Sequence, residues 1–127
     1  MVFLDTSVLV GSLTGLRSAS PALHKLMERD DPIKLSSLVI YEWLRGPRTE
    51  DEIQDQERLF PSAEAVQFGP REASLSADLY RSVRRARSRE IDIAIAACAI
   101  LNKARLWTLN PSDFSDIPGL QLYDPKT

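Results

Sequence analysis

The stretch REIDIAIAACAI, residues 89–100, has a charged start and an almost wholly apolar continuation. An apolar run of this length without Gly or Pro predicts a helix that is buried on all sides. The β-forming run LWTLN, residues 106–110, follows after a short connection,. A buried helix that leads into a strand is typical of an α/β fold. The unusual feature is that the carboxylates Glu90 and Asp92 stand where this helix begins.

Outward from this unit, short apolar runs alternate with helical patterns along the chain. Besides 106–110, the predicted strands are 2–5, 33–37, 65–69 and 120–124. Strands separated by helical segments of this length need right-handed crossovers and form a mainly parallel sheet with helices on both faces. We therefore predict a three-layer α/β/α arrangement with a five-stranded, mainly parallel sheet, and a single domain over residues 1–127.

Local signals predict where helices begin. Ser20 is a predicted N-cap with Pro21 at the first helical position,. Thr49, followed three residues later by Glu52, is a capping-box signature,. Pro70 is predicted to open a long amphipathic helix. Its apolar positions at helical spacing are Leu75, Leu79, Val83 and Ala86,.

The composition is that of an ordinary globular protein. The 127 residues are 43% hydrophobic and 27% charged, with a net charge of −2. Apolar stretches fall short of the roughly 20 residues that span a bilayer, and the start MVFLDTS has an acid where a signal peptide is apolar,. We expect a cytoplasmic, unprocessed protein with no membrane partner. Cys98, the single cysteine, lies in the apolar run and is expected to be buried and inert,.

Four acids follow predicted strands or stand in the helices that connect them. Asp5 ends the first strand, and Asp113 follows the strand at 106–110. Asp92 stands at the start of the preceding helix, and Glu42 lies in the helix after the second strand. In parallel α/β sheets, functional groups gather at the carboxyl ends of the strands, near the point where the strand order reverses. We therefore expect these four carboxylates to converge.

Each acid also has a simpler interpretation. Asp5 and Asp92 could cap helices, Glu42 could pair with Arg45, and Asp113 could hold a turn. Together these alternatives are weaker, because Glu42 is the charged exception in SLVIYEWL and a buried carboxylate is costly unless it shares a cation or a proton,. The pattern favours one shared site.

Carboxylates without a histidine among them are the ligand set of Mg²⁺ or Mn²⁺. The only histidine, His24, stands beside Lys25 in a polar-faced segment and is expected to be solvated. Zinc binding and histidine-based acid–base chemistry are therefore disfavoured. The acids favour metal-assisted hydrolysis, in which bound ions activate a water molecule and stabilise charge on a phosphate.

Five arginines directly precede Asp92, whereas TEDEIQDQE, residues 49–57, is almost purely acidic. They are Arg81, Arg84, Arg85, Arg87 and Arg89. Arginines beside an acidic pocket offset the repulsion between carboxylates and a polyanion. The arginines at 84, 85, 87 and 89 are therefore predicted to guide a nucleic-acid substrate. The simpler alternative is a charged, solvated helix face.

The motifs of the chain resemble those of PIN-domain ribonucleases, specifically the VapC-like toxins of type II toxin–antitoxin pairs. The matching segments are FLDTSVLV (3–10), SSLVIYEWLRG (36–46), DIAIAACAI (92–100) and LWTLNPSDFSDIPGLQLYDP (106–125). The resemblance covers essentially the whole chain, and TLNPSDF (108–114) is its most specific piece.

The resemblance implies an endoribonuclease that binds Mg²⁺ or Mn²⁺. It matches Asp5, Glu42, Asp92 and Asp113 to the acidic site of the family, and Ser7, Thr108 and Asn110 to polar positions that line it. Glu90 has no counterpart and is either a neighbour of the ligands or a charge at a helix N-terminus. The segment RRARSRE (84–90) departs from a loop that often carries glycine in relatives, which leaves the shape of the substrate approach open.

The resemblance also implies partners: an RNA substrate, a small cognate antitoxin that inserts a basic side chain near the acids, and a second copy in a homodimer. Candidate antitoxin contacts are Leu13, Leu16, Leu23 and Leu26. One alternative is a non-catalytic PIN-like module that only binds a partner or RNA. A phosphatase with an aspartate nucleophile is disfavoured, because DTSVL has Ser7 where that chemistry needs a second Asp,.

Overall fold

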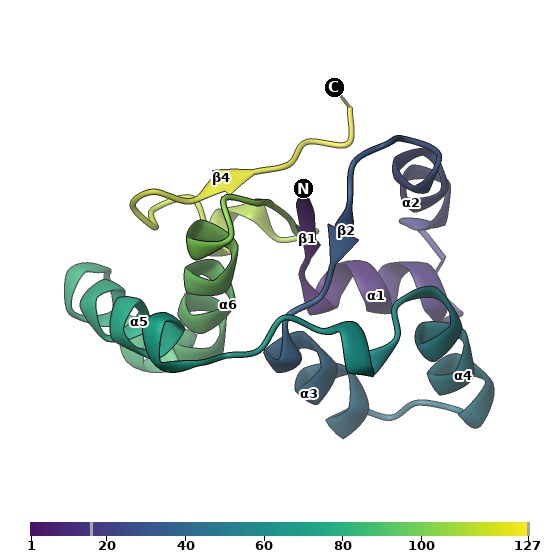
Figure 1. Ribbon diagram of the computed structural model, residues 1–127, viewed down its shortest axis with the longest axis horizontal. Coiled ribbons are helices and arrows are strands. Elements are labelled where there is room, and N and C mark those ends of the chain that lie inside the picture. The colour runs from purple at the N-terminus through teal and green to yellow at the C-terminus, as the bar shows by residue number, and fades with distance from the viewer. Residues whose placement is uncertain (16, 127) are drawn as a thin grey trace.

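The computed structural model describes residues 1–15 and 17–126 (Figure 1). Its strands are β1 (Val2–Leu4), β2 (Ile33–Lys34), β3 (Arg105–Trp107) and β4 (Gln121–Leu122). Its α-helices are α1 (Thr6–Leu13), α2 (Ser20–Met27), α3 (Ser37–Arg45), α4 (Glu50–Leu59), α5 (Pro70–Ser82) and α6 (Glu90–Leu101). Three short 3₁₀ helices are η1 (Ser62–Glu64), η2 (Ala86–Arg89) and η3 (Pro111–Asp113).

The sheet has the strand order β2-β1-β3-β4, and every neighbouring pair is parallel. Val2 of β1 stands opposite Ile33 of β2 and Arg105 of β3. The chain therefore passes from β1 to β2 on one side and then crosses to β3 on the other side. The strand order reverses between β1 and β3, so the carboxyl ends of these two strands form the edge where α/β folds bind ligands.

The helices cover both sides of this sheet, which confirms the predicted α/β/α arrangement. In Figure 1, α5 and α6 lie on one side of the molecule and α1, α2 and α4 lie on the other, with β1 and β2 between them. No helix within residues 1–15 and 17–126 is both long enough and apolar enough to span a membrane.

The sheet has four strands instead of the predicted five. The predicted strand at 65–69 is wrong, because only Val66 pairs there, through an isolated parallel bridge to Ser36. Two residues later, the N–H of Phe68 donates to the Ser37 hydroxyl at 3.2 Å instead of to a neighbouring strand. This side-chain acceptor ends the ladder before a strand can form. The other strands are shorter than their apolar runs.

Helix starts were predicted with mixed success. The capping box is confirmed: the N–H of Glu52 donates to Thr49 Oγ1 at 3.1 Å, and the N–H of Thr49 donates to Glu52 Oε1 at 2.8 Å. Ser20 is not the N-cap of α2. It is the first helical residue, after Ala19, because its hydroxyl donates to the carbonyl of Ser12 at 2.7 Å.

The helix that Pro70 opens is shorter than predicted. It ends at Ser82, with Val83 as C-cap, and Ala86 begins the separate turn η2. The helix ends because the backbone of Val83 is extended, and Arg85, with a left-handed backbone at a φ of 54°, then separates this segment from η2,.

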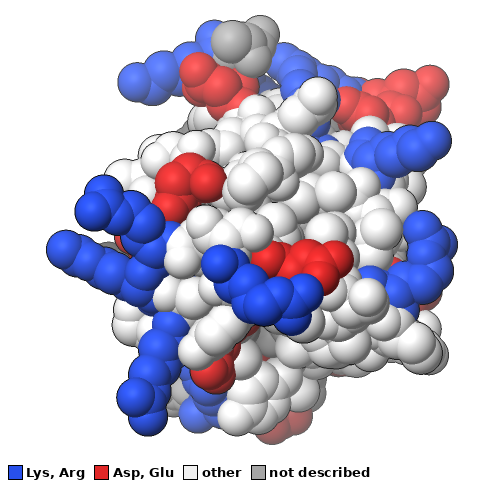
Figure 2. All heavy atoms as spheres, turned by 90° about the vertical axis from the view of Figure 1, so that its left-hand side faces the viewer, with Lys and Arg blue, Asp and Glu red and all other residues white. Residues whose placement is uncertain are grey.

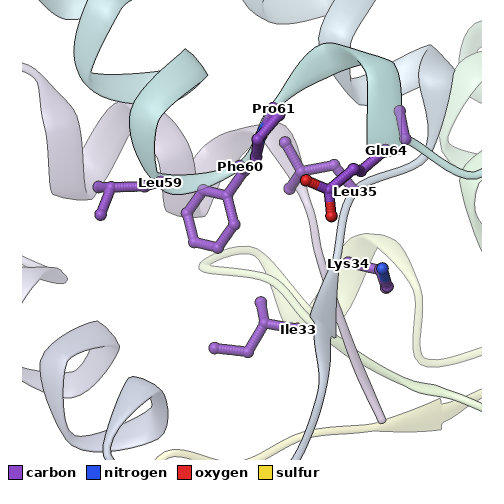
Figure 3. A pocket seen from close by; sticks show the side chains of 8 residues that line it. Ile33, Lys34, Leu35, Leu59, Phe60, Pro61 and Glu64 are labelled. Atoms are coloured by element: carbon purple, nitrogen blue, oxygen red, sulfur yellow. The ribbon is translucent and has the colours of Figure 1, made fainter.

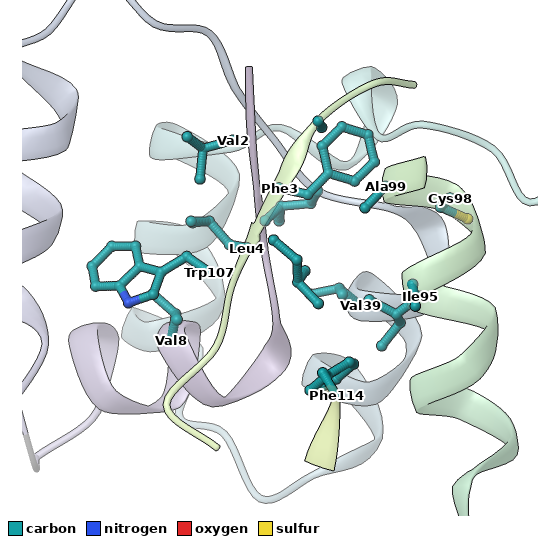
Figure 4. Close-up of a cluster of buried hydrophobic side chains, with 14 of the residues drawn as sticks. Val2, Phe3, Leu4, Val8, Val39, Ile95, Cys98, Ala99, Trp107 and Phe114 are labelled. Carbon is teal, nitrogen blue, oxygen red and sulfur yellow. The ribbon is translucent and has the colours of Figure 1, made fainter. Parts of the chain in front are cut away.

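The core lies on both faces of β1, whose three residues are at most 1% exposed. Figure 4 shows Trp107 of β3 on the side of Val8 in α1, and Phe3 on the side of Ala99 in α6. The apolar helix α6 is buried as predicted. Burial raises the pKa of the Cys98 thiol to about 12, so this cysteine stays protonated and unreactive as expected,.

The leucines proposed as antitoxin contacts are largely core. Leu23 is 2% exposed and Leu26 is fully buried, so these two candidates are wrong. The period of α2 turns both of them toward the interior. Leu13 is half-buried, and Leu16 lies outside the described residues. His24 is exposed, as expected.

Candidate active site

Asp5 lies at the junction between β1 and α1 and is 5% exposed. Its backbone caps α1, but its side chain forms no capping hydrogen bond. Its Oδ2 atom instead accepts hydrogen bonds from Ser7 Oγ at 2.9 Å and Thr108 Oγ1 at 2.8 Å. Its N–H donates to the carbonyl of Trp107 at 2.9 Å. The carboxylate is thus held at the edge between β1 and β3, where the strand order reverses.

The two hydroxyls that hold Asp5 are themselves oriented by the chain after β3. The N–H of Leu109 donates to Ser7 Oγ at 2.9 Å, and the N–H of Asn110 donates to Thr108 Oγ1 at 3.0 Å. Each hydroxyl oxygen accepts from the backbone, so its proton is directed to Asp5. The structure therefore brings Ser7 and Thr108 to the first acid, whereas the Asn110 side chain is exposed.

Glu42 projects from α3, and its side chain is 17% exposed. Its Oε1 atom accepts a hydrogen bond from Thr6 Oγ1 at 2.6 Å. Its Oε2 atom pairs with Arg45 at 3.4 Å, which is the simpler partner considered from the sequence. The sequence did not single out Thr6. Its position next to Asp5 was the only signal, and its reach to Glu42 depends on the packing of α1 against α3.

Asp92 stands in the first turn of α6 and is half-buried. Its pKa is raised to about 6, first by burial and then by the negative charges of Asp5, Glu42 and Asp113. The positive charge of Arg89 partly opposes this rise. The charges of the other three predicted acids therefore reach Asp92. Within residues 1–15 and 17–126, no three Asp, Glu, His or Cys side chains are close enough to hold an ion as they stand.

The other two acids of the prediction are exposed. Asp113 ends η3, and its neighbour Phe114 is 2% exposed and anchors the segment in the core. Glu90 is the first residue of α6. The charge of Asp113 contributes to the raised pKa of Asp92, whereas that of Glu90 is not among the causes. The charge of Asp113 thus acts on Asp92, whereas no such effect links Glu90 to Asp92.

Because Asp92 has a raised pKa, the folded protein binds its proton more tightly than the unfolded chain, whose pKa is near the ordinary value of 3.8,. The resulting stability is present below pH 4 and is lost as the pH rises to about 6. We therefore expect Asp92→Asn to raise the free energy of unfolding by about 1–2 kcal/mol at pH 7.5 in the presence of a chelator, after allowance for partial exposure.

At pH 3.5 the same variant is expected to come close to the parent, because Asp92 is then protonated in the folded state and mostly protonated in the unfolded chain,. Urea unfolding followed by circular dichroism at the two pH values measures the difference. Asp55→Asn, on the exposed face of α4, is the control and should show no such pH-dependent gain. An equal gain for Asp92→Asn at both pH values would contradict the assignment.

Two hollows adjoin the acids. The larger has a volume of about 790 Å³ and is lined by Arg84, Arg85, Arg89, Ser112, Asp113, Ser115 and Asp116. The other, of about 330 Å³, is lined by Glu42, Arg45, Arg87, Ser88, Arg89, Glu90, Ile91 and Asp92. Arginines therefore line the surface next to three of the four acids. A separate pocket of about 60 Å³ between β2 and the end of α4 contains none of the four (Figure 3).

The predicted RNA-binding arginines fall into two groups. The side chains of Arg84, Arg85 and Arg87 are exposed. The side chain of Arg89 is only 16% exposed and pairs with Asp116 at 2.6 Å. The hydrogen bond to Asp116 raises the pKa of Arg89, and the same bond lowers the pKa of Asp116. Asp116 was not found from the sequence, since nothing local links two residues 27 positions apart.

Basic side chains do not form one continuous surface on the side of α5. In Figure 2 they stand singly or in small groups among acidic and uncharged residues. With a net charge of −2, the protein has no general attraction for a polyanion,. Any nucleic-acid contact therefore depends on local arginines such as those beside the acids.

Comparison with known proteins places this fold and sequence in a family. The family described as PIN domain matches residues 2–120. Ribonuclease VapC19 of Mycobacterium tuberculosis is 33% identical over 128 residues, which cover 95% of this chain and 98% of the relative.

Solved structures with the same fold extend the similarity. DNA-bound VapBC from Salmonella typhimurium matches with a TM-score of 0.78 and 17% identity, over 98% of this chain and 97% of that one. A toxin–antitoxin complex from Klebsiella pneumoniae matches with a TM-score of 0.75 and 23% identity, over 98% of both chains. Since the family match and the VapC relative both span nearly the whole sequence, this chain belongs to the PIN-domain family and is a VapC-type member of it.

Proposed function

We propose that this protein is a metal-dependent endoribonuclease, the toxin of a type II toxin–antitoxin pair, which hydrolyses RNA phosphodiester bonds at Asp5, Glu42, Asp92 and Asp113. The main support is the placement of Asp5, almost fully buried at the edge where the strand order reverses, together with the effect of the charges of Asp5, Glu42 and Asp113 on Asp92. The similarity to a protein named as a ribonuclease supports the same substrate class.

The donor set fits Mg²⁺ or Mn²⁺. All four side chains offer carboxylate oxygens, which these hard ions prefer. Among the described residues, Asp5 has hydroxyl partners but no ion pair, so its buried charge is one that a divalent cation would offset,. When bound, the ion supplies Lewis acidity that activates water and neutralises charge on the phosphate.

The residues of the chain orient the acids and receive the substrate. Ser7 and Thr108 fix the rotamer of Asp5, and Thr6 fixes that of Glu42. In the proposed mechanism, Arg84, Arg85 and Arg87 receive RNA phosphates next to the acids. These exposed arginines offset the repulsion between four carboxylates and a polyanion,.

The test is cleavage of end-labelled, single-stranded RNA oligonucleotides by the purified protein. Internal cuts are expected with Mn²⁺ or Mg²⁺, and none above background with excess EDTA, because without the ion nothing lowers the pKa of water or neutralises charge on the phosphate. Calorimetric titration with Mn²⁺ measures binding without RNA. If the protein retained RNA but neither bound Mn²⁺ nor cut, a non-catalytic RNA-binding module would replace the nuclease.

We also propose a small antitoxin as protein partner and a homodimer as the assembled toxin. Solved structures that share the fold are toxin–antitoxin complexes, which supports the first partner. Induced expression is expected to arrest bacterial growth, and co-expression of the neighbouring gene to relieve the arrest. Growth that continues at a high level of soluble protein would count against the toxin.

A further inference from the structure

Arg89 makes four hydrogen bonds within the chain. Its Nη1 donates to the carbonyl of Arg84 at 2.8 Å and to Asp116 Oδ2 at 3.0 Å. Its Nη2 donates to the carbonyl of Asp113 at 2.8 Å and to Asp116 Oδ1 at 2.6 Å. The guanidinium therefore joins the segment before α6 to the segment around η3.

This junction lies between two of the proposed metal ligands. Arg89 directly precedes α6 and stands three residues before Asp92. On the other side it binds the backbone of Asp113 itself, which leaves the carboxylate of that residue available for a cation. Of the described residues, Arg89 is also the one that lines both hollows next to the acids.

We propose that Arg89 and Asp116 are a positioning pair that sets the placement of Asp113 relative to Asp92, and thereby the affinity of the site for a divalent cation. This inference rests on the proposed function, because it takes Asp92 and Asp113 as metal ligands. Side chains that hold metal ligands in place commonly change metal affinity by about 10- to 100-fold when they are removed.

The hydrogen-bond geometry separates Arg89 from the arginines that we propose contact RNA. A guanidinium has five N–H groups, four of them on the two terminal nitrogens. The four bonds of Arg89 use all four terminal N–H groups. A phosphate could bind this side chain through the terminal nitrogens only by breaking a bond to Asp116, Asp113 or Arg84. Arg84, Arg85 and Arg87 carry exposed side chains and have no such constraint.

Arg89→Ala distinguishes three roles by titration with Mn²⁺ in a calorimeter and by steady-state cleavage. If Arg89 positions the ligands, the Kd for Mn²⁺ rises by about 10-fold or more and kcat falls. If it were only a nearby positive charge, its removal would tighten Mn²⁺ binding, because one repulsive charge is lost. If it were an RNA contact, KM would rise, whereas kcat and the Kd for Mn²⁺ would stay unchanged.

Arg87→Ala is the matched control, because it removes the same charge from the same segment but from an exposed side chain. Its Kd for Mn²⁺ is expected to stay unchanged or to fall slightly. Arg89→Lys keeps the charge but cannot form the forked contact with Asp116, so it is expected to bind Mn²⁺ as weakly as Arg89→Ala does. Arg58→Ala, in an exposed pair on α4, should leave both measurements unchanged.

Asp116→Asn keeps the test decisive if Arg89→Ala fails to fold. Asp116 is 44% exposed, so its substitution leaves the core intact. It is expected to raise the Kd for Mn²⁺. The double variant Arg89→Ala/Asp116→Asn should bind Mn²⁺ no more weakly than the single variant with the higher Kd, since both substitutions disrupt the same contact between Arg89 and Asp116,. Fully additive effects would contradict a pair that acts as a unit.

The outcomes also separate this inference from the proposed function. A parent protein that neither binds Mn²⁺ nor cuts RNA overturns the nuclease assignment and the positioning pair with it. A parent that binds and cuts, together with a folded Arg89→Ala variant whose Mn²⁺ affinity equals or exceeds that of the parent, overturns the positioning pair alone.

Discussion

Asp5→Asn is expected to lower the rate of RNA cleavage by at least about 100-fold, since the site loses several kcal/mol of charge stabilisation. The variant should still fold. Both hydroxyl donors to Asp5 reach the same oxygen, Oδ2, and the amide oxygen of asparagine can accept from Ser7 and Thr108 in the same place,. The substitution therefore removes the charge and keeps the hydrogen bonds.

The measurement is cleavage of labelled RNA at saturating Mn²⁺, with thermal unfolding as the check on folding. Asp55→Asn makes the same chemical change on the exposed surface of α4 and should cut like the parent. If folded Asp5→Asn also cut like the parent, the activity would belong to other residues or to a contaminating nuclease.

Phe114→Ala is expected to lower the free energy of unfolding by about 3–5 kcal/mol, the usual cost of removing a buried aromatic ring. Phe114 is 2% exposed and lies in the core close to α6, as Figure 4 shows. It also follows Asp113 directly, so a cavity there loosens the segment that carries this acid. Cleavage should therefore fall even at temperatures where the variant is still folded.

Urea unfolding measures the loss of stability, and cleavage at low temperature measures the effect on the site. Phe114→Leu fills most of the volume and should lose far less stability. Tyr80→Ala, at an aromatic ring that is 40% exposed, should cost little in comparison. A loss below about 1 kcal/mol for Phe114→Ala would show that the segment does not depend on this anchor.

The parallel sheet, and the edge to which it brings Asp5, could be predicted because they follow from chain-wide patterns. Strands separated by helices specify a parallel sheet, and that sheet brings the residues after β1 and β3 to one edge. The predictions that failed concern local hydrogen bonds whose partners are brought close only by the tertiary structure. Phe68 bonds to the Ser37 hydroxyl instead of a strand, and the Ser20 hydroxyl bonds to Ser12 instead of capping α2.

The hydrogen-bond partners of the site could not be predicted for the same reason. Thr6 reaches Glu42 only through the packing of α1 against α3, and Arg89 reaches Asp116 across 27 positions. In the sequence, Arg89 looks like the other arginines of its segment, and its burial and its hydrogen bonds to Asp116 become visible only in the structure. Periodicity reports which face of an element is buried, but it does not report which polar groups meet.

The hydroxyls around Asp5 have a consequence for when the protein becomes competent during synthesis. Thr108 is separated from Asp5 by 103 positions, and the backbone of Leu109 is separated from Ser7 by 102. A nascent chain in which β3 and the residues after it have not yet emerged from the ribosome therefore lacks the groups that orient Asp5. Products that stop before residue 108 lack the Thr108 hydroxyl and the Leu109 N–H, so the hydrogen bonds around Asp5 are complete only after residues 108–109 have emerged.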